Sequence, residues 1–219
     1  MKTADLGAMN WELIHRWNSV VIGFFIVAHL GVHLFAVASP EAHGAAAGVL
    51  RRYYLDPRFE TVLLASLIVQ IISGYAELRL FVKPVWRLVR NLSGLYLLAF
   101  MTLHVASVMY ARHVDHMPTD FYWAAGAFAV EPLRYAAIGF YGLGVFSFFA
   151  HMIAVWALAW KTMPGRFLAF LWSLAVVVTA LILSAFSGAL YEIDMPASVL
   201  EYYKAYFSHT PFLQSSAGG

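Results

Sequence analysis

The chain of 219 residues contains no cysteine, and only 12% of its residues are charged. Without cysteine it forms no disulfide, and it supplies no thiolate for zinc or for an iron–sulfur cluster. Soluble domains carry about 25% charged residues, so a deficit of this size argues against a domain folded in water. Apolar residues fill the difference, since 62% of the chain is hydrophobic and its mean hydropathy is +0.70.

Five apolar runs are long enough to cross a bilayer, which takes about 20 helical residues. They cover about residues 17–38, 61–80, 92–111, 135–160 and 167–190. Backbone groups in lipid are satisfied only in helices or closed barrels, and these runs lack the alternation of barrel strands. The sequence therefore predicts an all-α integral membrane bundle of five transmembrane helices over residues 1–195. A polar, partly loose C-terminal tail, residues 196–219, is expected outside the bilayer.

The loops between these runs differ in charge. The face that holds the N-terminus collects eight basic residues and three acids, while the opposite face has six basic residues and nine acids. The basic residues of the first face are Lys2, Arg16, Arg79, Lys83, Arg87, Arg90, Lys161 and Arg166. By the positive-inside rule, the N-terminus is expected in the cytoplasm and the C-terminus outside. Segments 39–60 and 112–134 are expected to be outer loops, the second with an aromatic run, Phe121-Tyr122-Trp123, at the headgroup level.

Few polar side chains lie within the runs, and ionisable ones in lipid are costly and usually functional. They are His29, His33, Gln70, His104 and His151. With a helix rise of about 1.5 Å per residue, His29 lies about 18 Å and His104 about 21 Å from the N-terminal face. Gln70 and His151 lie about 15 Å and about 14 Å from the same face. These four residues therefore form two levels, a deeper pair and a shallower pair.

A haem with two axial imidazoles needs two histidines at one level that face each other from different helices. His29 and His104 meet the level requirement on two parallel helices. Six-coordinate haem suits electron transfer because it has no open position. The alternative is that each histidine only hydrogen-bonds a neighbouring helix. His33 lies one turn beyond His29 on the same helix face, either as the alternative ligand or as a neighbour that hydrogen-bonds or contacts a quinone.

Two further sets of polar residues lie near the ends of the runs. Arg16, Ser19, Arg90 and Ser93 lie where the first and third runs begin. They either anchor and pack these helices or hydrogen-bond the propionates or other oxygens of a cofactor. The remaining histidines lie in loops or at the rims, where most are expected in water: His15, His43, His113, His116 and His209. Of these, His113 and His116 are placed to exchange protons on the outer side.

Three stretches of the sequence carry a resemblance to a known family. They are Ala28-His29-Leu30-Gly31-Val32-His33, then Arg90-Asn91-Leu92-Ser93-Gly94 followed by Leu103-His104-Val105, and Phe149-Ala150-His151. In order and spacing they resemble the single-chain, five-helix cytochrome b subunit of succinate dehydrogenases and fumarate reductases. The resemblance covers nearly the whole chain in helix order and loop size.

In diheme members of that family, the first and third helices hold the haem distal to the catalytic subunits, and the second and fourth hold the proximal one. The resemblance therefore implies that His29 and His104 ligate a distal haem b and that His151 is the ligand from the fourth helix. Gln70 stands where the second helix would supply its histidine, and glutamine is not a usual axial ligand. A second haem is then either absent or held by His151 with another partner.

The resemblance implies the membrane anchor of a succinate:quinone oxidoreductase in a bacterial-type inner (cytoplasmic) membrane. Electrons would pass through haem b between an iron–sulfur subunit and a membrane quinone. The flavoprotein and iron–sulfur subunits would dock on the cytoplasmic face and carry out the dicarboxylate chemistry. The whole complex can form oligomers, and no nucleic acid is expected as a partner. The quinone pocket is expected near the distal haem on the outer side, with His33 and Glu60 as candidates.

Two other functions fit the same sequence. One is a cytochrome b anchor for another respiratory enzyme, such as a hydrogenase, a formate dehydrogenase or a heterodisulfide reductase. The other is a haem-free membrane scaffold or a small-molecule transporter that uses its histidines as proton relays. An absorption spectrum of the purified protein separates the pigmented functions from the haem-free ones.

Overall fold

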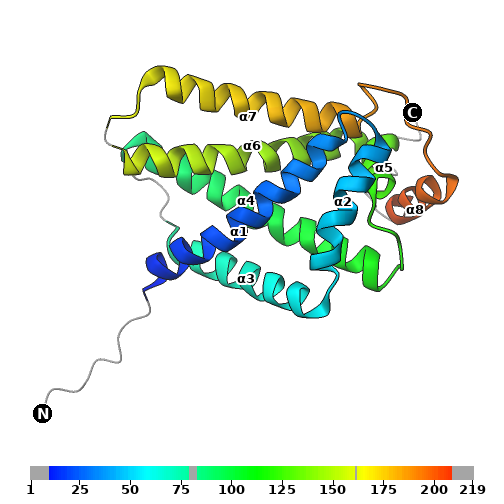
Figure 1. Ribbon diagram of the computed structural model, residues 1–219, viewed down its shortest axis with the longest axis horizontal. Helices are drawn as coiled ribbons and strands as arrows, with labels where there is room; N and C mark the ends of the chain where they lie inside the picture. The colour runs from blue at the N-terminus through cyan, green and yellow to red at the C-terminus, as the bar shows by residue number, and fades with distance from the viewer. Residues whose placement is uncertain (1–9, 79–82, 161, 209–219) are drawn as a thin grey trace, which may run out of the picture.

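The computed structural model describes residues 10–78, 83–160 and 162–208 (Figure 1). These residues form helices and no strand: α1 (Trp11–Phe35), α2 (Pro40–Tyr54), α3 (Pro57–Ala76), α4 (Val85–His113), α5 (Phe121–Ala129), α6 (Leu133–Ala159), α7 (Gly165–Phe186) and α8 (Ala197–Ser208). Five of them, α1, α3, α4, α6 and α7, are long and apolar enough to cross a membrane. The predicted all-α membrane bundle is confirmed, and the chain is a multi-pass membrane protein.

Some of the predicted features fall outside the described residues. These are the end of the second expected run (residues 79–80), the tail from residue 209 with His209, and Lys2, Arg79 and Lys161 of the basic face. The five spanning helices each overlap their expected run, and all five begin a few residues earlier.

Short polar side chains explain where several helices begin. Asn10 caps α1, because its side chain accepts a hydrogen bond from the Leu13 amide at 3.0 Å. The segment expected as a loop over residues 39–60 contains α2. Ser39 caps it in the same way, and Pro40 occupies a first-turn position where a missing N–H costs little. Pro40 therefore begins a helix in a segment that was expected to be a loop.

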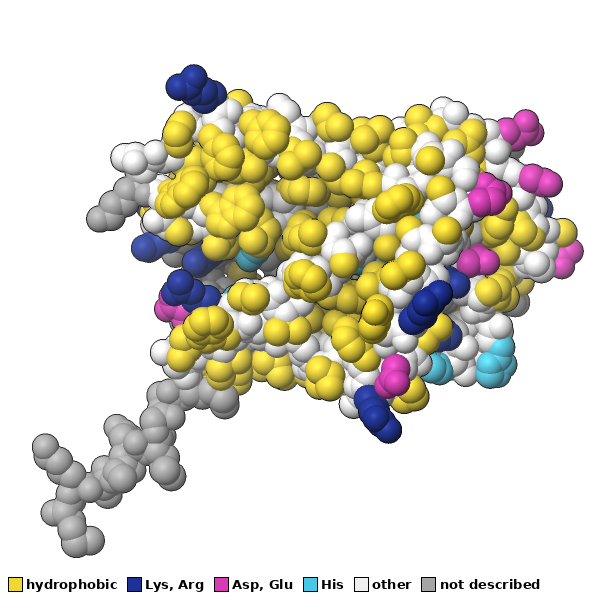
Figure 2. All heavy atoms as spheres, in the orientation of Figure 1, with side chains coloured by type: hydrophobic (Ala, Val, Ile, Leu, Met, Phe, Trp, Pro, Cys, Tyr) yellow, Lys and Arg dark blue, Asp and Glu magenta, His cyan; other side chains and the backbone are white. Residues whose placement is uncertain are grey.

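The spanning helices keep their apolar side chains on the outside of the molecule. Phe24 is 80% exposed, Tyr75 is 71% exposed and Trp17 is 68% exposed. Figure 2 shows hydrophobic side chains covering this face of the bundle. In water such a surface would be strongly unfavourable, whereas lipid solvates it. Among the five spanning helices, α6 has the largest share of residues buried inside the protein, and α1 and α4 have the smallest.

The core lies at one end of the bundle, where α2, α5 and α8 gather beside the last turns of α1, α4 and α7 (Figure 1). Two side chains of the aromatic run that begins α5, Phe121 and Trp123, are buried at 2% and 7% exposure. Part of the expected loose tail forms α8, which packs on α5. The hydroxyl of Tyr203 donates to the Trp123 carbonyl at 2.7 Å. Gly126 makes this contact feasible, because a Cβ there would lie 2.4 Å from the Tyr203 ring.

The spanning helices pack in two groups. α1 packs on α3 and α2, while α4 and α7 both pack on α6. Contacts of α3 with α4 and of α1 with α7 join the groups. This arrangement leaves a cavity between α1 and α4 near the core end, and the candidate site lies there.

Candidate functional site

A partly open cavity of about 240 Å³ is lined by residues from α1 to α7. Its inner walls are apolar and aromatic, with Phe25, Leu67 and Phe100 among them. Its end toward α2 and α5 is polar, and we call this end the polar mouth; it comprises His43, Arg51, Tyr54, Glu60, Arg112, Thr119, Asp120 and Trp123. An apolar pocket with a few converging polar groups is typical of cofactor and small-molecule sites.

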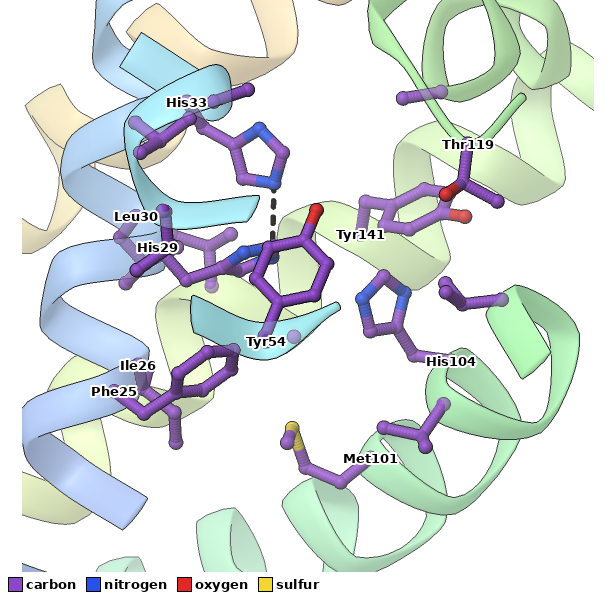
Figure 3. A pocket seen from close by; sticks show the side chains of 18 of the residues that line it. Phe25, Ile26, His29, Leu30, His33, Tyr54, Met101, His104, Thr119 and Tyr141 are labelled. Carbon is purple, nitrogen blue, oxygen red and sulfur yellow. Dashed lines mark hydrogen bonds between the residues drawn. The ribbon is translucent and has the colours of Figure 1, made fainter. Parts of the chain in front are cut away.

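His29 of α1 and His104 of α4 point toward each other across this cavity (Figure 3). Their ring centroids are 6.1 Å apart and the ring planes are inclined by 57°. Aromatic neighbours hold both rings in place. Phe25 stacks on His29 at 5.8 Å, and Phe100 stacks on His104 at 5.4 Å with the planes nearly parallel. Tyr141 of α6 meets the His104 ring edge-on at 6.0 Å.

Three histidines form a hydrogen-bonded row that starts in the cavity. His33 Nε2 lies 3.1 Å from His29 Nε2, and His33 Nδ1 lies 3.2 Å from His43 Nε2. His43 belongs to α2, which packs against α1. Its ring stacks on the His33 ring, with the two centroids 5.3 Å apart. Only 4% of His43 is exposed, so the expectation that most loop histidines face water is wrong for this residue.

His43 is neutral near pH 7. Burial lowers the pKa of its imidazole to about 4, the charge of Arg51 acts in the same direction, and Asp120 opposes them. One ring nitrogen of His43 therefore carries a proton and the other does not.

The geometry of the His29 and His104 pair fits two axial imidazoles. A metal–imidazole bond is about 2 Å long, so two rings on opposite sides of one metal ion have centroids about 6 Å apart. The apolar walls suit a porphyrin. His29 Nε2 lies 3.1 Å from His33 Nε2, so His29 would have to give up this contact in order to hold a metal ion. Among the described residues, no group of three or more histidine or acidic side chains is arranged around a metal ion.

Charged side chains at the polar mouth are hydrogen-bonded, and two of them form an ion pair. Arg112 donates to Glu60 and lies 5.6 Å from the centre of the Tyr54 ring. His113, at the end of α4, lies 3.9 Å from the same carboxylate. Arg51 donates to the Thr119 carbonyl and, at 3.3 Å, to the Tyr54 hydroxyl. The predicted quinone candidates His33 and Glu60 thus both line the cavity, and Glu60 is held by Arg112.

Gln70 lies in a polar network between α1 and α3, at the shallower level. Its carbonyl oxygen accepts from Asn18 at 2.7 Å, and its amide nitrogen lies 3.2 Å from both ring nitrogens of His15. The hydroxyl of Ser73 lies 3.1 Å from His15 Nδ1. His15, expected at a rim in water, is instead half-buried against Gly74, where a Cβ would lie 3.1 Å from the ring. Both polar ends of Gln70 are therefore occupied by side chains of α1.

His151 of α6 is held against α4 at the same level. Its Nδ1 lies 3.0 Å from the Arg90 carbonyl and 3.4 Å from the Ser93 hydroxyl. Gly94 allows this approach, since a Cβ there would lie 3.2 Å from the imidazole. His151 is near enough to His15 to interact with it electrostatically.

The four residues considered for propionate binding lie away from the His29–His104 cavity. Arg16 is exposed, and Ser19 donates to the Arg16 carbonyl within α1. Arg90 donates to the adjacent Asn91 side chain, and Ser93 donates to the Val89 carbonyl at 2.7 Å. None of the four is among the residues that line the cavity. Their hydrogen bonds stabilise helices and the position of His151.

Several residues of the site were missed by reasoning from the sequence, chiefly those of the polar mouth. His43, Arg51 and Trp123 come from segments expected to be loops. A signal for α2 was present, since Ser39-Pro40 matches a cap followed by a first-turn proline. No sequence signal indicates that α5 packs against the end of the bundle.

Comparisons with protein-family profiles, curated proteins and solved structures found no match. The functional assignment therefore rests on the residues and geometry of this chain.

Proposed function

We propose that this chain is a haem b-binding membrane anchor of a succinate:quinone oxidoreductase, which carries electrons between an iron–sulfur subunit and a membrane quinone. One observation carries the haem assignment: His29 and His104 face each other across an apolar cavity, with ring centroids 6.1 Å apart. The succinate:quinone oxidoreductase assignment is supported by the order of sequence motifs that surround these histidines.

In this proposal His29 and His104 would hold the haem iron, and haem b would supply one-electron redox chemistry when bound. Phe25 and Phe100 stack on the two imidazoles and fix their orientation. The apolar walls would limit the access of water to a haem bound there, and such walls together with imidazole ligands influence a haem's reduction potential. Tyr141, against the edge of His104, restricts rotation of that ring.

We favour a single haem per chain. The shallower level offers His151, but the residue at the matching place on α3 is Gln70, which is engaged with Asn18 and His15. A glutamine bound at both ends has no free group to present to a metal. The network instead joins α1 to α3.

The distribution of charge supports the proposed orientation. Figure 2 shows most of the acidic side chains at the end where α2, α5 and α8 lie, together with several basic ones, while basic side chains predominate at the opposite end. The positive-inside rule assigns the basic end to the cytoplasm. The flavoprotein and iron–sulfur subunits would dock on that face by charge complementarity, and the polar mouth would open toward the outer side.

A second function is favoured by one specific observation. The row formed by His29, His33 and His43 is hydrogen-bonded through 3.1 Å and 3.2 Å contacts. Rows of histidines in membrane proteins serve as proton relays, so a haem-free proton-coupled transporter is the rival function.

Purification of the tagged chain from its native membrane tests the assignment. The proposal predicts a pigmented complex with a flavin-containing subunit and an iron–sulfur subunit that oxidises succinate or reduces fumarate. Co-purification with hydrogenase or formate dehydrogenase subunits would assign the chain to another respiratory enzyme. A colourless protein without partner subunits would favour the transporter.

A further inference from the structure

A second cavity lies at the turn that joins α6 to α7, at the end of the bundle opposite α2, α5 and α8 (Figure 1). Its volume is about 300 Å³, near the lower limit for small-molecule sites. Three of the four residues that line it are aromatic, and we call it the aromatic pocket; they are Trp156, Trp160 and Phe167, with Ala159 as the fourth. The aromatic side chains are between 37% and 59% exposed, so a molecule in the pocket can reach their rings.

The ends of two helices bring the three rings together. Trp156 lies in the last turn of α6, and Trp160 directly follows that helix and donates its N–H to the Trp156 carbonyl at 2.8 Å. Phe167 lies in the first turn of α7. Its ring centroid is 5.9 Å from that of Trp160, and the two ring planes are inclined by 48°. The rings therefore line the pocket from both sides of the turn.

The rings and the helix end both favour a cation. The face of an aromatic ring carries partial negative charge, and aromatic cages commonly bind organic ammonium groups for this reason. The last carbonyls of α6 add partial negative charge, and no basic side chain lies in the last turn of this helix. Residues 156–167 include no Asp or Glu, so the turn supplies no carboxylate ligand for a metal ion. An organic ammonium group, which carries apolar carbon next to its charge, suits this lining.

The position of the pocket specifies where the ammonium group comes from. Both α6 and α7 are long and apolar enough to span a membrane, so the turn between them lies at the level of the lipid headgroups. The organic ammonium groups concentrated at that level belong to ethanolamine and choline phospholipids. These headgroups also carry a phosphate, and Arg166, which is exposed and precedes Phe167 in α7, supplies a positive charge at the same turn.

We propose that the aromatic pocket binds the headgroup of an ethanolamine or choline phospholipid, with the three rings in contact with the ammonium group and Arg166 near the phosphate. Such a site selects the zwitterionic headgroup, whereas ordinary interfacial tryptophans anchor helices without regard to headgroup charge. The aromatic pocket shares no lining residue with the larger cavity. The inference therefore goes beyond the proposed function and does not depend on it.

Competition between phospholipids with the same acyl chains tests the proposal. The purified full-length chain, with any subunits that accompany it, is incubated in detergent micelles with equal amounts of phosphatidylethanolamine, phosphatidylcholine and phosphatidylglycerol. Native mass spectrometry then counts the lipids that the protein retains. Trp156→Leu keeps an apolar side chain and removes the ring. It should lower the ratio of retained zwitterionic lipid to phosphatidylglycerol by about twofold to fivefold, as expected for one lost cation–π contact at an exposed site.

Three further variants complete the test. Trp17→Leu is the matched control, because Trp17 is an exposed tryptophan of α1 that lines neither cavity; it should leave the ratio unchanged. Arg166→Gln should reduce retention of all three lipids with little change in the ratio, because each lipid carries a phosphate. Phe167→Leu should lower the ratio as Trp156→Leu does, and it serves if Trp156→Leu does not fold.

Several outcomes would overturn the inference. A ratio that stays at the wild-type value in both Trp156→Leu and Phe167→Leu would show that these rings are ordinary interfacial anchors, and so would an equal fall in Trp17→Leu. Loss of an accompanying subunit from Trp156→Leu, with the lipid ratio unchanged, would assign the pocket to a basic side chain of that subunit. Haem content is read separately from the visible spectrum, so a wild type without haem would refute the proposed function while the lipid ratios still decide this inference.

Discussion

Gly144 of α6 lies against Phe100, the ring that stacks on His104. Replacement of Gly144 by alanine should destabilise the bundle. A Cβ at this position would lie 2.5 Å from Phe100 Cε2 and 2.7 Å from two further atoms of the same ring. The ring has little room to turn, because it stacks on His104 at 5.4 Å and packs on Phe140 at 4.8 Å. Overpacking of this kind costs about 1–3 kcal/mol.

Gly139 provides a control on the same helix. No atom lies within 4 Å of a Cβ built there, and alanine is a better helix former than glycine by about 1 kcal/mol. Gly139→Ala should therefore unfold at the same denaturant concentration as the wild type or at a higher one, and Gly144→Ala at a lower one. Unfolding of each purified protein in mixed detergent micelles, followed by circular dichroism, measures the difference. Equal stability of the two variants would refute the described packing of α4 on α6.

Two further predictions concern the α1–α3 network and His43. Asn18→Ala removes hydrogen bonds to the Ser66 carbonyl and to Gln70, so it should lower the free energy of unfolding by about 1–2 kcal/mol. Ser19→Ala loses only a hydrogen bond within α1 and should change the free energy of unfolding little. Both variants are measured in the same micelle assay. Burial chiefly lowers the pKa of His43 from 6.5 to about 4 in the folded protein. As the pH falls, His43 is therefore protonated in the unfolded chain at a higher pH than in the folded protein. The contribution of His43 to the free energy of unfolding is full above about pH 6.5 and declines toward pH 4. A His43→Gln variant should lose less stability than the wild type over that interval, and identical pH profiles would contradict a neutral, buried His43.

The apolar runs predicted the five spanning helices because a bilayer imposes a length and a hydrophobicity that few other contexts require. The level calculation also placed His29 with His104, since a helix converts residue number into depth at a nearly constant rise. Their mutual orientation follows from packing and was not available from depth.

The parts that sequence reasoning missed depend on tertiary contacts. α2 and α5 are short helices in segments expected to be outer loops, and hydropathy does not mark them as part of the site, although both line the cavity. His15 lies at a rim in sequence, but Ser73 and Gln70 of α3 bring it into a hydrogen-bonded network. Ser19 and Ser93, which were considered as cofactor-binding residues, donate hydrogen bonds to carbonyls of their own helices. Spacing in the sequence does not distinguish such a serine from one that binds a ligand.

The central claim is that His29 and His104 together hold one haem, and the visible spectrum of the purified protein tests it most directly. The reduced wild type should show a b-type α-band, with one haem per chain by the pyridine haemochrome assay. His29→Ala and His104→Ala should each abolish this pigment, and His151→Ala should retain it. A colourless wild type, or a pigment that survives both of the first two substitutions unchanged, would contradict the account.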